Sequence, residues 1–473
     1  MKKKWIKQAL CVGLSLAVVA AMTGCVGDSG NSEVPAETTA AATTAEGDDT
    51  AEVVDDTADS GEKITLRFWD MVWGDAEYAA EAEKLAQRYT EENPNVEIEY
   101  QSIPWQNRYE TFSVAIASGE GPDVSTGGGY QQHQFAASGD ILPLNDIIDE
   151  WEAEGKLDDF PEGMVEFFQD SEGNQLGIPF NIDPRGILYR TDLFEEAGIE
   201  IPTTWDELYE AAVQLTDADD NQYGLVYPVS DSTANIVFAS WMLANGGGVW
   251  NEDGITPTWT SEENKETIEF ITKLRDAGVF PDGMASYENP DAQKVFLQGN
   301  AAMIVNSVGL GTQIVDQGEE FAGKVALMPM PKGPSAAEPA MASAMNAYMA
   351  YSTTEHPEEA KAFLKWWSEN NLELWTGLAK CGSPPARLSF LNDPSYTGME
   401  QNPLIVQMYE KWIPEIKSTM YPGKSANLVQ NTIDAEKWWT DMSQAVLVGE
   451  KTADQMLEEK QNMAEEAIED FGL

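Results

Sequence analysis

The chain has 473 residues and a formal net charge of −53, because 81 acidic residues face only 28 basic ones. A surface this negative repels nucleic acids and anionic lipids, so neither is an expected partner. The length is sufficient for two lobes, since single hydrophobic cores rarely grow beyond about 250–300 residues.

The first residues have the pattern of a secretory signal. Four lysines precede an apolar run from residue 9 to residue 22, which predicts a signal peptide over residues 1–24 and is too short to favour a transmembrane helix. Residues 22–25, Met-Thr-Gly-Cys, resemble the lipobox of bacterial lipoproteins. We therefore expect Cys25 to be the lipidation site that anchors the exported chain to the outer face of the cytoplasmic membrane. An ordinary cleaved signal or an uncleaved anchor is the alternative.

An acidic segment follows the cysteine. Residues 26–62 contain eleven acids but no basic or aromatic residue, so they cannot bury enough apolar surface to fold. We expect residues 25–62 to form the acylated cysteine and a disordered tether. Once Cys11 leaves with the signal and Cys25 is acylated, Cys381 is left alone, and no intramolecular disulfide is expected.

Strand and helix patterns alternate from residue 63 onward. The apolar run Ile64–Trp69 predicts a buried strand, and residues 82–89 repeat at helical spacing before the alternating strand Val96–Tyr100. Thr204–Glu207 has the sequence of a capping box, and His356-Pro357 marks another helix start. Strands separated by helices predict an α/β fold with parallel sheets that are covered by helices.

Nine short segments, in their order along the chain, match a known family. They are Ile64–Trp69, Gly121–Val124, Phe135–Leu144, Gly177–Phe180, Leu188–Gly198, Pro202–Leu208, Phe296–Met303, Met328–Pro331 and Gly382–Arg387. Each is weak alone, but together and in this order they resemble the family 1 extracellular solute-binding proteins, the carbohydrate-binding lipoproteins of ABC importers.

The resemblance implies a two-lobed periplasmic-binding-protein type II-like fold with a ligand cleft between lobes that are joined by crossover hinges. The matched segments place lobe 1 at residues 63–179 and 328–384, and lobe 2 at residues 180–327 and 385–473. The implied function is capture of a sugar, an oligosaccharide in particular, and its delivery to the permease subunits of an ABC transporter. We expect a monomer that meets the membrane only through its lipid, without cofactor, metal or catalytic residues.

Ligand contacts in the first lobe are expected near strand ends, where α/β sheets bind ligands. Asp70 and Trp73 follow the first strand at a position where family members contact sugar. Tyr130 belongs to a glycine-rich turn that either approaches the ligand closely or is only a turn. Aromatic rings and polar side chains of these types suit the ring faces and hydroxyls of a sugar.

Further contacts are expected at the crossovers and in the second lobe. Asn181, Asp183 and Arg185 lie in a loop that faces the cleft in relatives, although Asp183 and Arg185 could instead form an ion pair. The remaining candidates are Trp241, which resembles the family's stacking helix, Asn306, Ser307 and Arg387. Relatives often carry Gly-Pro-Trp where this chain has Ser307-Val308-Gly309, so an aromatic platform is missing there.

Two other functions fit parts of the sequence. A binding protein for a non-sugar solute would share the fold. An exported glycoside hydrolase needs two carboxylates about 5–10 Å apart, but no acid lies in a hydrolase-like motif. Residues 217–221 are similar to a calcium loop, yet Gln222 stands where glycine is needed, and a turn is the better interpretation.

Overall fold

The computed structural model describes residues 63–74, 76–106, 108–161, 163–376, 381–396, 402–423 and 427–473. The expected signal peptide, the lipidation site Cys25 and the acidic tether lie outside these residues. The described residues, from Lys63 to Leu473, belong to one compact unit. None of the helices in the described ranges is both long enough and apolar enough to cross a membrane.

The first sheet is built around the N-terminal strand. Its strands are β1 (Ile64–Met71), β2 (Val96–Ile103), β3 (Val124–Gly127), β4 (Ile178–Pro184), β9 (Met341–Ala350) and β10 (Ile416–Lys417), in the order β10-β9-β3-β1-β2 with β4 also paired to β9. β1 runs parallel to β2 and β3, as predicted. β9 runs antiparallel to β3 and β4, so the sheet is mixed where a parallel one was expected.

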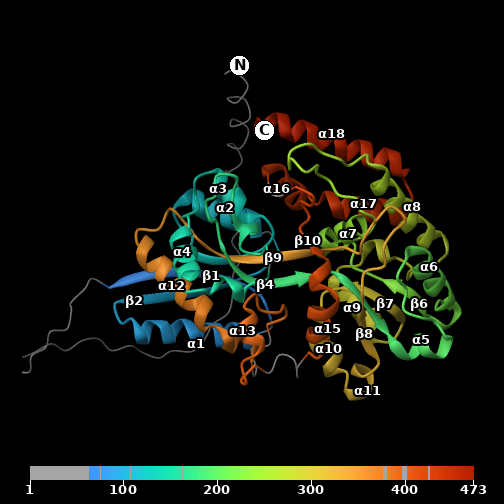
Figure 1. The fold of residues 1–473 in the computed structure, drawn as a ribbon, viewed down its shortest axis with the longest axis horizontal. Helices are drawn as coiled ribbons and strands as arrows, with labels where there is room; N and C mark the ends of the chain where they lie inside the picture. The colour runs from blue at the N-terminus through green and yellow to red at the C-terminus, as the bar shows by residue number, and fades with distance from the viewer. Residues whose placement is uncertain are drawn as a thin grey trace, which may run out of the picture. The chain divides into compact units, whose positions relative to one another are not determined.

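Helices cover the first sheet and bury their apolar stripes against it. They are α1 (Ala76–Glu92), α2 (Arg108–Ser118), α3 (Gln131–Ala137), α4 (Asn145–Ala153), α12 (Pro357–Asn370) and the short α13 (Leu388–Leu391). In α1 the buried residues Tyr78, Ala82, Leu85 and Tyr89 recur every three or four positions, which places them on one face of the helix. The sheet and these helices form lobe 1 (Figure 1).

The second sheet has the strand order β6-β7-β5-β8. Its strands are β5 (Gly186–Arg190), β6 (Tyr223–Val226), β7 (Ala301–Asn306) and β8 (Val325–Met328). The helices of this lobe 2 are α5 (Thr191–Ala197), α6 (Trp205–Gln214), α7 (Thr233–Ala244), α8 (Glu262–Asp276), α9 (Asn289–Leu297), α10 (Leu310–Asp316), α11 (Glu319–Ala322), α15 (Leu404–Lys411), α16 (Leu428–Ala435), α17 (Trp438–Val448) and α18 (Ala453–Phe471). The predicted capping box is present at the start of α6.

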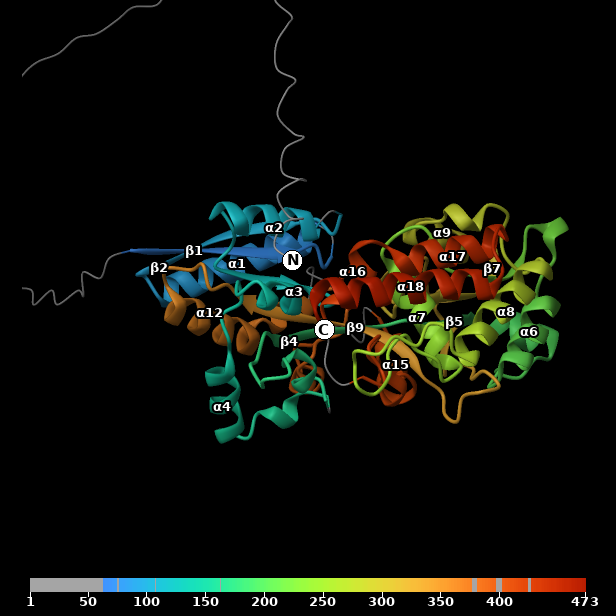
Figure 2. The ribbon, with the colours of Figure 1, turned by 90° about the horizontal axis from the view of Figure 1, so that it is seen from above.

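Two hydrophobic cores define the lobes, and strand β9 belongs to both. The first core takes residues between 66 and 182 and between 347 and 396, whereas the second takes residues between 187 and 342 and between 404 and 464, together with Tyr130. Residues 328–342 therefore pack in the second core and residues 386–396 in the first, which differs from the expected boundaries at 327 and 384. The first of these differences arises because β9 begins in one core with Met341 and ends in the other with Ala350. In Figure 2, β4 and β9 run together between the lobes.

Candidate ligand site between the lobes

Asp70 is the second-last residue of β1 and is fully buried. Its Oδ1 accepts hydrogen bonds from Trp73 Nε1 at 3.0 Å and from Thr126 Oγ1 at 2.6 Å. Its Oδ2 accepts from the hydroxyls of Tyr78 and Tyr100, each at 3.1 Å. Burial raises the pKa of Asp70 to about 6, although the four hydrogen bonds act in the opposite direction. All four donors belong to lobe 1, so the Asp70 carboxylate is already engaged within that lobe.

Aromatic rings line the region beside Asp70. The Trp73 ring is buried and meets Trp105 edge to face, with centroids 4.8 Å apart, and Phe180 at 4.9 Å. Trp105 is only partly buried, and the Arg108 guanidinium lies over both Trp105 and Tyr109, at 5.3 and 4.3 Å from the ring centroids. Lobe 1 therefore presents partly exposed aromatic surface directly after the carboxyl end of β2.

A glycine turn brings the two lobes close together at this point. A Cβ atom on Gly128 would lie 2.6 Å from Asn346 Oδ1 and 3.1 Å from the Trp105 ring. A Cβ on Gly129, whose φ is +66°, would lie 3.4 Å from the Tyr109 hydroxyl and 3.9 Å from Asp434 Oδ2. Asp434 comes from α16 of lobe 2, which lies beside α3 of lobe 1 (Figures 1 and 2).

Several polar groups around this turn are buried and lack hydrogen-bond partners. They are the Tyr109 hydroxyl, Arg108 Nε, Asn181 Nδ2 and both side-chain polar atoms of Asn431. Asn431 lies three residues before Asp434, so both side chains project from the same face of α16. Asn346 Nδ2 donates to Asn181 Oδ1 at 2.5 Å, which leaves the Asn181 amide nitrogen to serve another acceptor.

Asp434 is the acidic group of this cluster. The partly buried carboxylate receives one long hydrogen bond, from Gln430 Nε2 at 3.5 Å. Burial raises its pKa to about 7, while Arg108 and Gln430 act in the opposite direction. Burial also raises the pKa of the Tyr109 phenol. We name the set Trp105, Arg108, Tyr109, Asn181, Asn346, Asn431 and Asp434 the interlobe cluster.

The chemistry of the interlobe cluster suits a polyhydroxylated ligand. Buried polar groups without partners cost about 1–3 kcal/mol each, and a ligand that supplies both donors and acceptors recovers this cost. A carboxylate and carboxamide oxygens accept hydrogen bonds from hydroxyls, while guanidinium and amide N–H groups donate to them. The partly exposed Trp105 ring adds an apolar face for packing.

Only one of the ten predicted residues, Asn181, is itself a member of the interlobe cluster. Asp70 and Trp73 are not members, but Trp73 contacts the member Trp105 and hydrogen-bonds Asp70. Asp183 and Arg185 form the ion pair that was the alternative interpretation. Tyr130 follows the glycine turn but packs into the second core, where its hydroxyl hydrogen-bonds Thr419 Oγ1 at 2.9 Å.

The other four predicted residues are engaged away from this cluster. Trp241 is fully buried against Tyr227 and Phe270. Asn306 Nδ2 donates to Asn289 Oδ1 at 2.8 Å, and Ser307 Oγ accepts from Gly309 N. The Arg387 guanidinium pairs with Asp159 at 2.9 Å and lies 4.6 Å from the centre of the Trp151 ring. Their role as ligand contacts stays a prediction.

Sequence reasoning missed the other six residues of the interlobe cluster, which are Trp105, Arg108, Tyr109, Asn346, Asn431 and Asp434. A signal existed for Trp105, because it comes two residues after β2 and the carboxyl ends of parallel strands are favoured ligand positions. No local pattern marked Asp434, since it reaches the site only through the packing of a helix from the last tenth of the chain. No group of three or more His, Cys, Asp or Glu in the described ranges is arranged to hold a metal ion.

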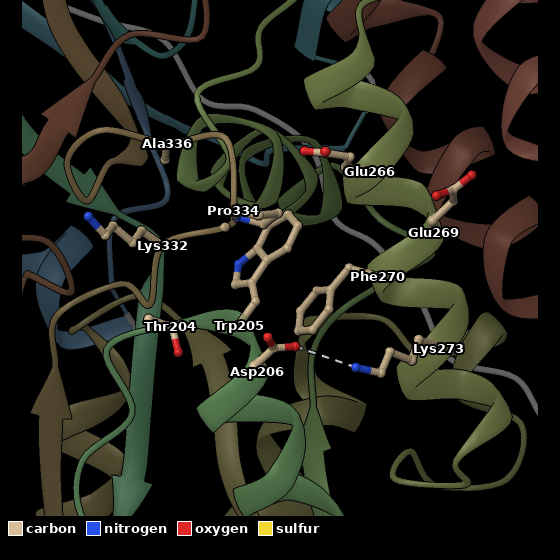
Figure 3. Close-up of a pocket in the computed structure, with 11 residues that line it drawn as sticks. Thr204, Trp205, Asp206, Glu266, Glu269, Phe270, Lys273, Lys332, Pro334 and Ala336 are labelled. Carbon is tan, nitrogen blue, oxygen red and sulfur yellow. Dashed lines mark ion pairs between the residues drawn. The ribbon is translucent and has the colours of Figure 1, made fainter.

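A separate surface pocket of about 550 Å³ lies entirely on lobe 2, between α6, α8 and residues 332–336 (Figure 3). Trp205 and Phe270 stack in its wall, with centroids 4.3 Å apart. Its charged groups are mostly engaged: Lys273 pairs with Asp206 at 3.6 Å, and Lys332 Nζ donates to a backbone oxygen at 3.0 Å. The interlobe cluster, with its unpaired polar groups, is therefore the stronger candidate.

Comparison with known proteins agrees with the two-lobed geometry. The family model described as bacterial extracellular solute-binding protein matches residues 74–370. The chain belongs to this family. Its fold is the two-lobed α/β fold of the periplasmic binding proteins, as predicted.

Individual proteins resemble this chain in sequence or in structure. A putative binding protein of Brucella abortus (strain 2308) is 26% identical over 55% of this chain and 63% of its own length. The maltotriose-binding protein of Pyrococcus abyssi is 25% identical over 66% and 64%. The match thus spans less than two thirds of these two relatives. A sugar transporter from Arthrobacter chlorophenolicus A6, solved with bound laminaribiose, is 29% identical with a TM-score of 0.75, covering 85% of this chain and 99% of that one.

Proposed function

We propose that this protein is the substrate-binding component of an ABC importer and captures a carbohydrate, an oligosaccharide in particular, between its two lobes. The observation that carries the proposal is the interlobe cluster, which combines buried polar groups without partners from both lobes with a partly exposed tryptophan. Sugar-binding relatives of similar fold support it. The captured sugar would be delivered to membrane permease subunits.

Anchoring belongs to the same proposal. The lipobox-like residues 22–25 support an acylated Cys25 and a position on the outer face of the cytoplasmic membrane. The acidic residues 26–62 would then serve as the tether between lipid and lobes. The protein would act as a monomer, and as a binding protein rather than an enzyme.

Ligand binding is tested by thermal unfolding of the purified protein with laminaribiose, maltose, arabino-oligosaccharides, a peptide mixture and spermidine. A ligand at 100 times its dissociation constant stabilises the folded state by about 2.7 kcal/mol, which is a clear rise in melting temperature. We expect a rise with one saccharide series. A response to the peptide or amine alone would leave the fold assignment intact and refute the substrate class.

Site location is tested with the variant Asn431→Ala and its control Asn264→Ala. Asn431 has no partner among the described residues, whereas Asn264 hydrogen-bonds the backbone inside lobe 2. The first variant should weaken saccharide binding and keep the melting temperature. The second should lower the melting temperature and leave affinity unchanged. Equal affinities in wild type and Asn431→Ala would place the site elsewhere.

A further inference from the structure

We infer that Asp70 is a positioning residue of the ligand site: its buried carboxylate fixes the Trp73 indole and, through it, the Trp105 ring of the interlobe cluster. The identity of the ligand rests on the proposed function, but the contacts that carry this inference do not. Asp70 was predicted to touch the ligand, and the structure gives its oxygens other partners.

The four donors to Asp70 come from four places in lobe 1. Trp73 lies just after β1, Thr126 on β3, Tyr78 on α1 and Tyr100 on β2. An ionised carboxylate only accepts hydrogen bonds and can serve all four at once, whereas a protonated one must also donate. The indole N–H of Trp73 can only donate, and it lies 3.0 Å from both Asp70 Oδ1 and Thr126 Oγ1. A proton on Oδ1 therefore leaves this N–H with the Thr126 hydroxyl as its remaining acceptor and shifts the geometry that holds the ring.

Two contacts lead from Asp70 to the interlobe cluster. The Trp73 ring stands against the edge of Trp105 at an interplanar angle of 83°. Trp105 Nε1 donates to the backbone oxygen of Val72 at 2.7 Å, so both indoles are tied to the stretch that directly follows Asp70. A shift of Trp73 therefore moves the ring that lies 3.1 Å from the Cβ position of Gly128.

The four hydrogen bonds stabilise the ionised carboxylate of Asp70, whereas burial destabilises it. No Lys or Arg in the described ranges pairs with it, and the titratable groups around it are Tyr78, Tyr100, Tyr348 and Cys381. Burial is the main reason why its pKa lies near 6. The carboxylate is thus about 97% ionised at pH 7.5 and about 9% ionised at pH 5. If the ionised form alone holds the tryptophans, ligand affinity falls about tenfold between these values.

A ligand-free measurement tests the inference directly. The near-ultraviolet circular dichroism of the coupled Trp73 and Trp105 rings is recorded from pH 5 to pH 8, and the variant Trp105→Phe identifies their signal. Wild type should titrate with a midpoint near pH 6. Asp70→Asn should show no such titration. Asp434→Asn removes the other carboxylate near the site whose pKa is raised, and it should keep the wild-type midpoint.

Binding measurements separate this inference from the proposed function. With laminaribiose as the probe, or whichever saccharide stabilises the wild type, Asp70→Asn should bind about tenfold more weakly at pH 7.5. A wild-type tryptophan signal that is flat from pH 5 to pH 8, or an identical titration in Asp70→Asn, overturns the inference. A titration near pH 6 without any saccharide binding supports the inference while refuting the proposed function.

Discussion

Replacing Asp434 by asparagine should make the protein more stable at alkaline pH. The pKa of Asp434 in the folded protein lies near 7, against an ordinary value of 3.8, because burial penalises its charged form. The folded state therefore binds this proton more tightly than the unfolded state. Its contribution to the free energy of unfolding is favourable at low pH and is lost as the pH rises from about 4 to about 7. Asparagine cannot ionise and avoids this loss.

The size of the effect follows from the shift. About three pKa units at about 1.4 kcal/mol each give an upper limit near 4 kcal/mol. Because the side chain keeps some contact with solvent, we expect about 2 kcal/mol. In a chain of this length that corresponds to roughly 2–4 °C in melting temperature, since larger proteins shift by fewer degrees for each kcal/mol.

The assay is calorimetric unfolding of both proteins at pH 5, 6, 7 and 8. The stability gain of Asp434→Asn over wild type should be largest at pH 8 and should shrink toward pH 5. Asp206→Asn is the control, because the Asp206 side chain is 92% exposed; it should not reproduce this pH-dependent gain. A variant that is no more stable than wild type at pH 8, or a gain that is the same at pH 5, would refute the reasoning.

Three further substitutions separate affinity from stability. Trp105→Ala should weaken saccharide binding about fivefold by calorimetric titration with little change in melting temperature, because an aromatic contact contributes about 1 kcal/mol and the ring is partly exposed. Unchanged affinity would remove Trp105 from the site. Gly129→Ala should lose about 1–2 kcal/mol of stability, since its φ is +66°, and it should also lose affinity for the saccharide. The control Gly139→Ala has a φ of +81° and nothing within 4 Å of the added Cβ, so it should lose stability alone. Arg387→Met should cost about 3–5 kcal/mol in urea unfolding by leaving the Asp159 carboxylate unpaired and should keep affinity; lost affinity with normal stability would restore the predicted ligand contact.

The fold could be predicted because its signals are local. The capping box at Thr204 and the helix start at His356-Pro357 depend on side chains within one helical turn, and both were predicted correctly. The alternation of strands and helices gave the α/β class. The antiparallel run of β9 could not be predicted in this way, because strand direction depends on partners more than 150 residues away.

The candidate site was harder to predict because sequence shows residue type but not which partners a side chain already has. Asp70 and Arg387 have the chemistry of sugar contacts, yet both are engaged by neighbours within lobe 1. Asp434 looks unremarkable on its helix and gains importance only because α16 packs beside the Gly129 turn. Distances of this kind arise from tertiary packing, which residue spacing does not encode.

Strand β9 has a consequence for the order in which the chain can fold. It is the partner of both β3 and β4, yet it begins only at Met341. A nascent chain that ends before this residue cannot complete the sheet of lobe 1, although most strands of that sheet were made much earlier. The first lobe therefore cannot fold until more than two thirds of the polypeptide has been synthesised. This delay would keep an exported chain unfolded while it crosses a membrane.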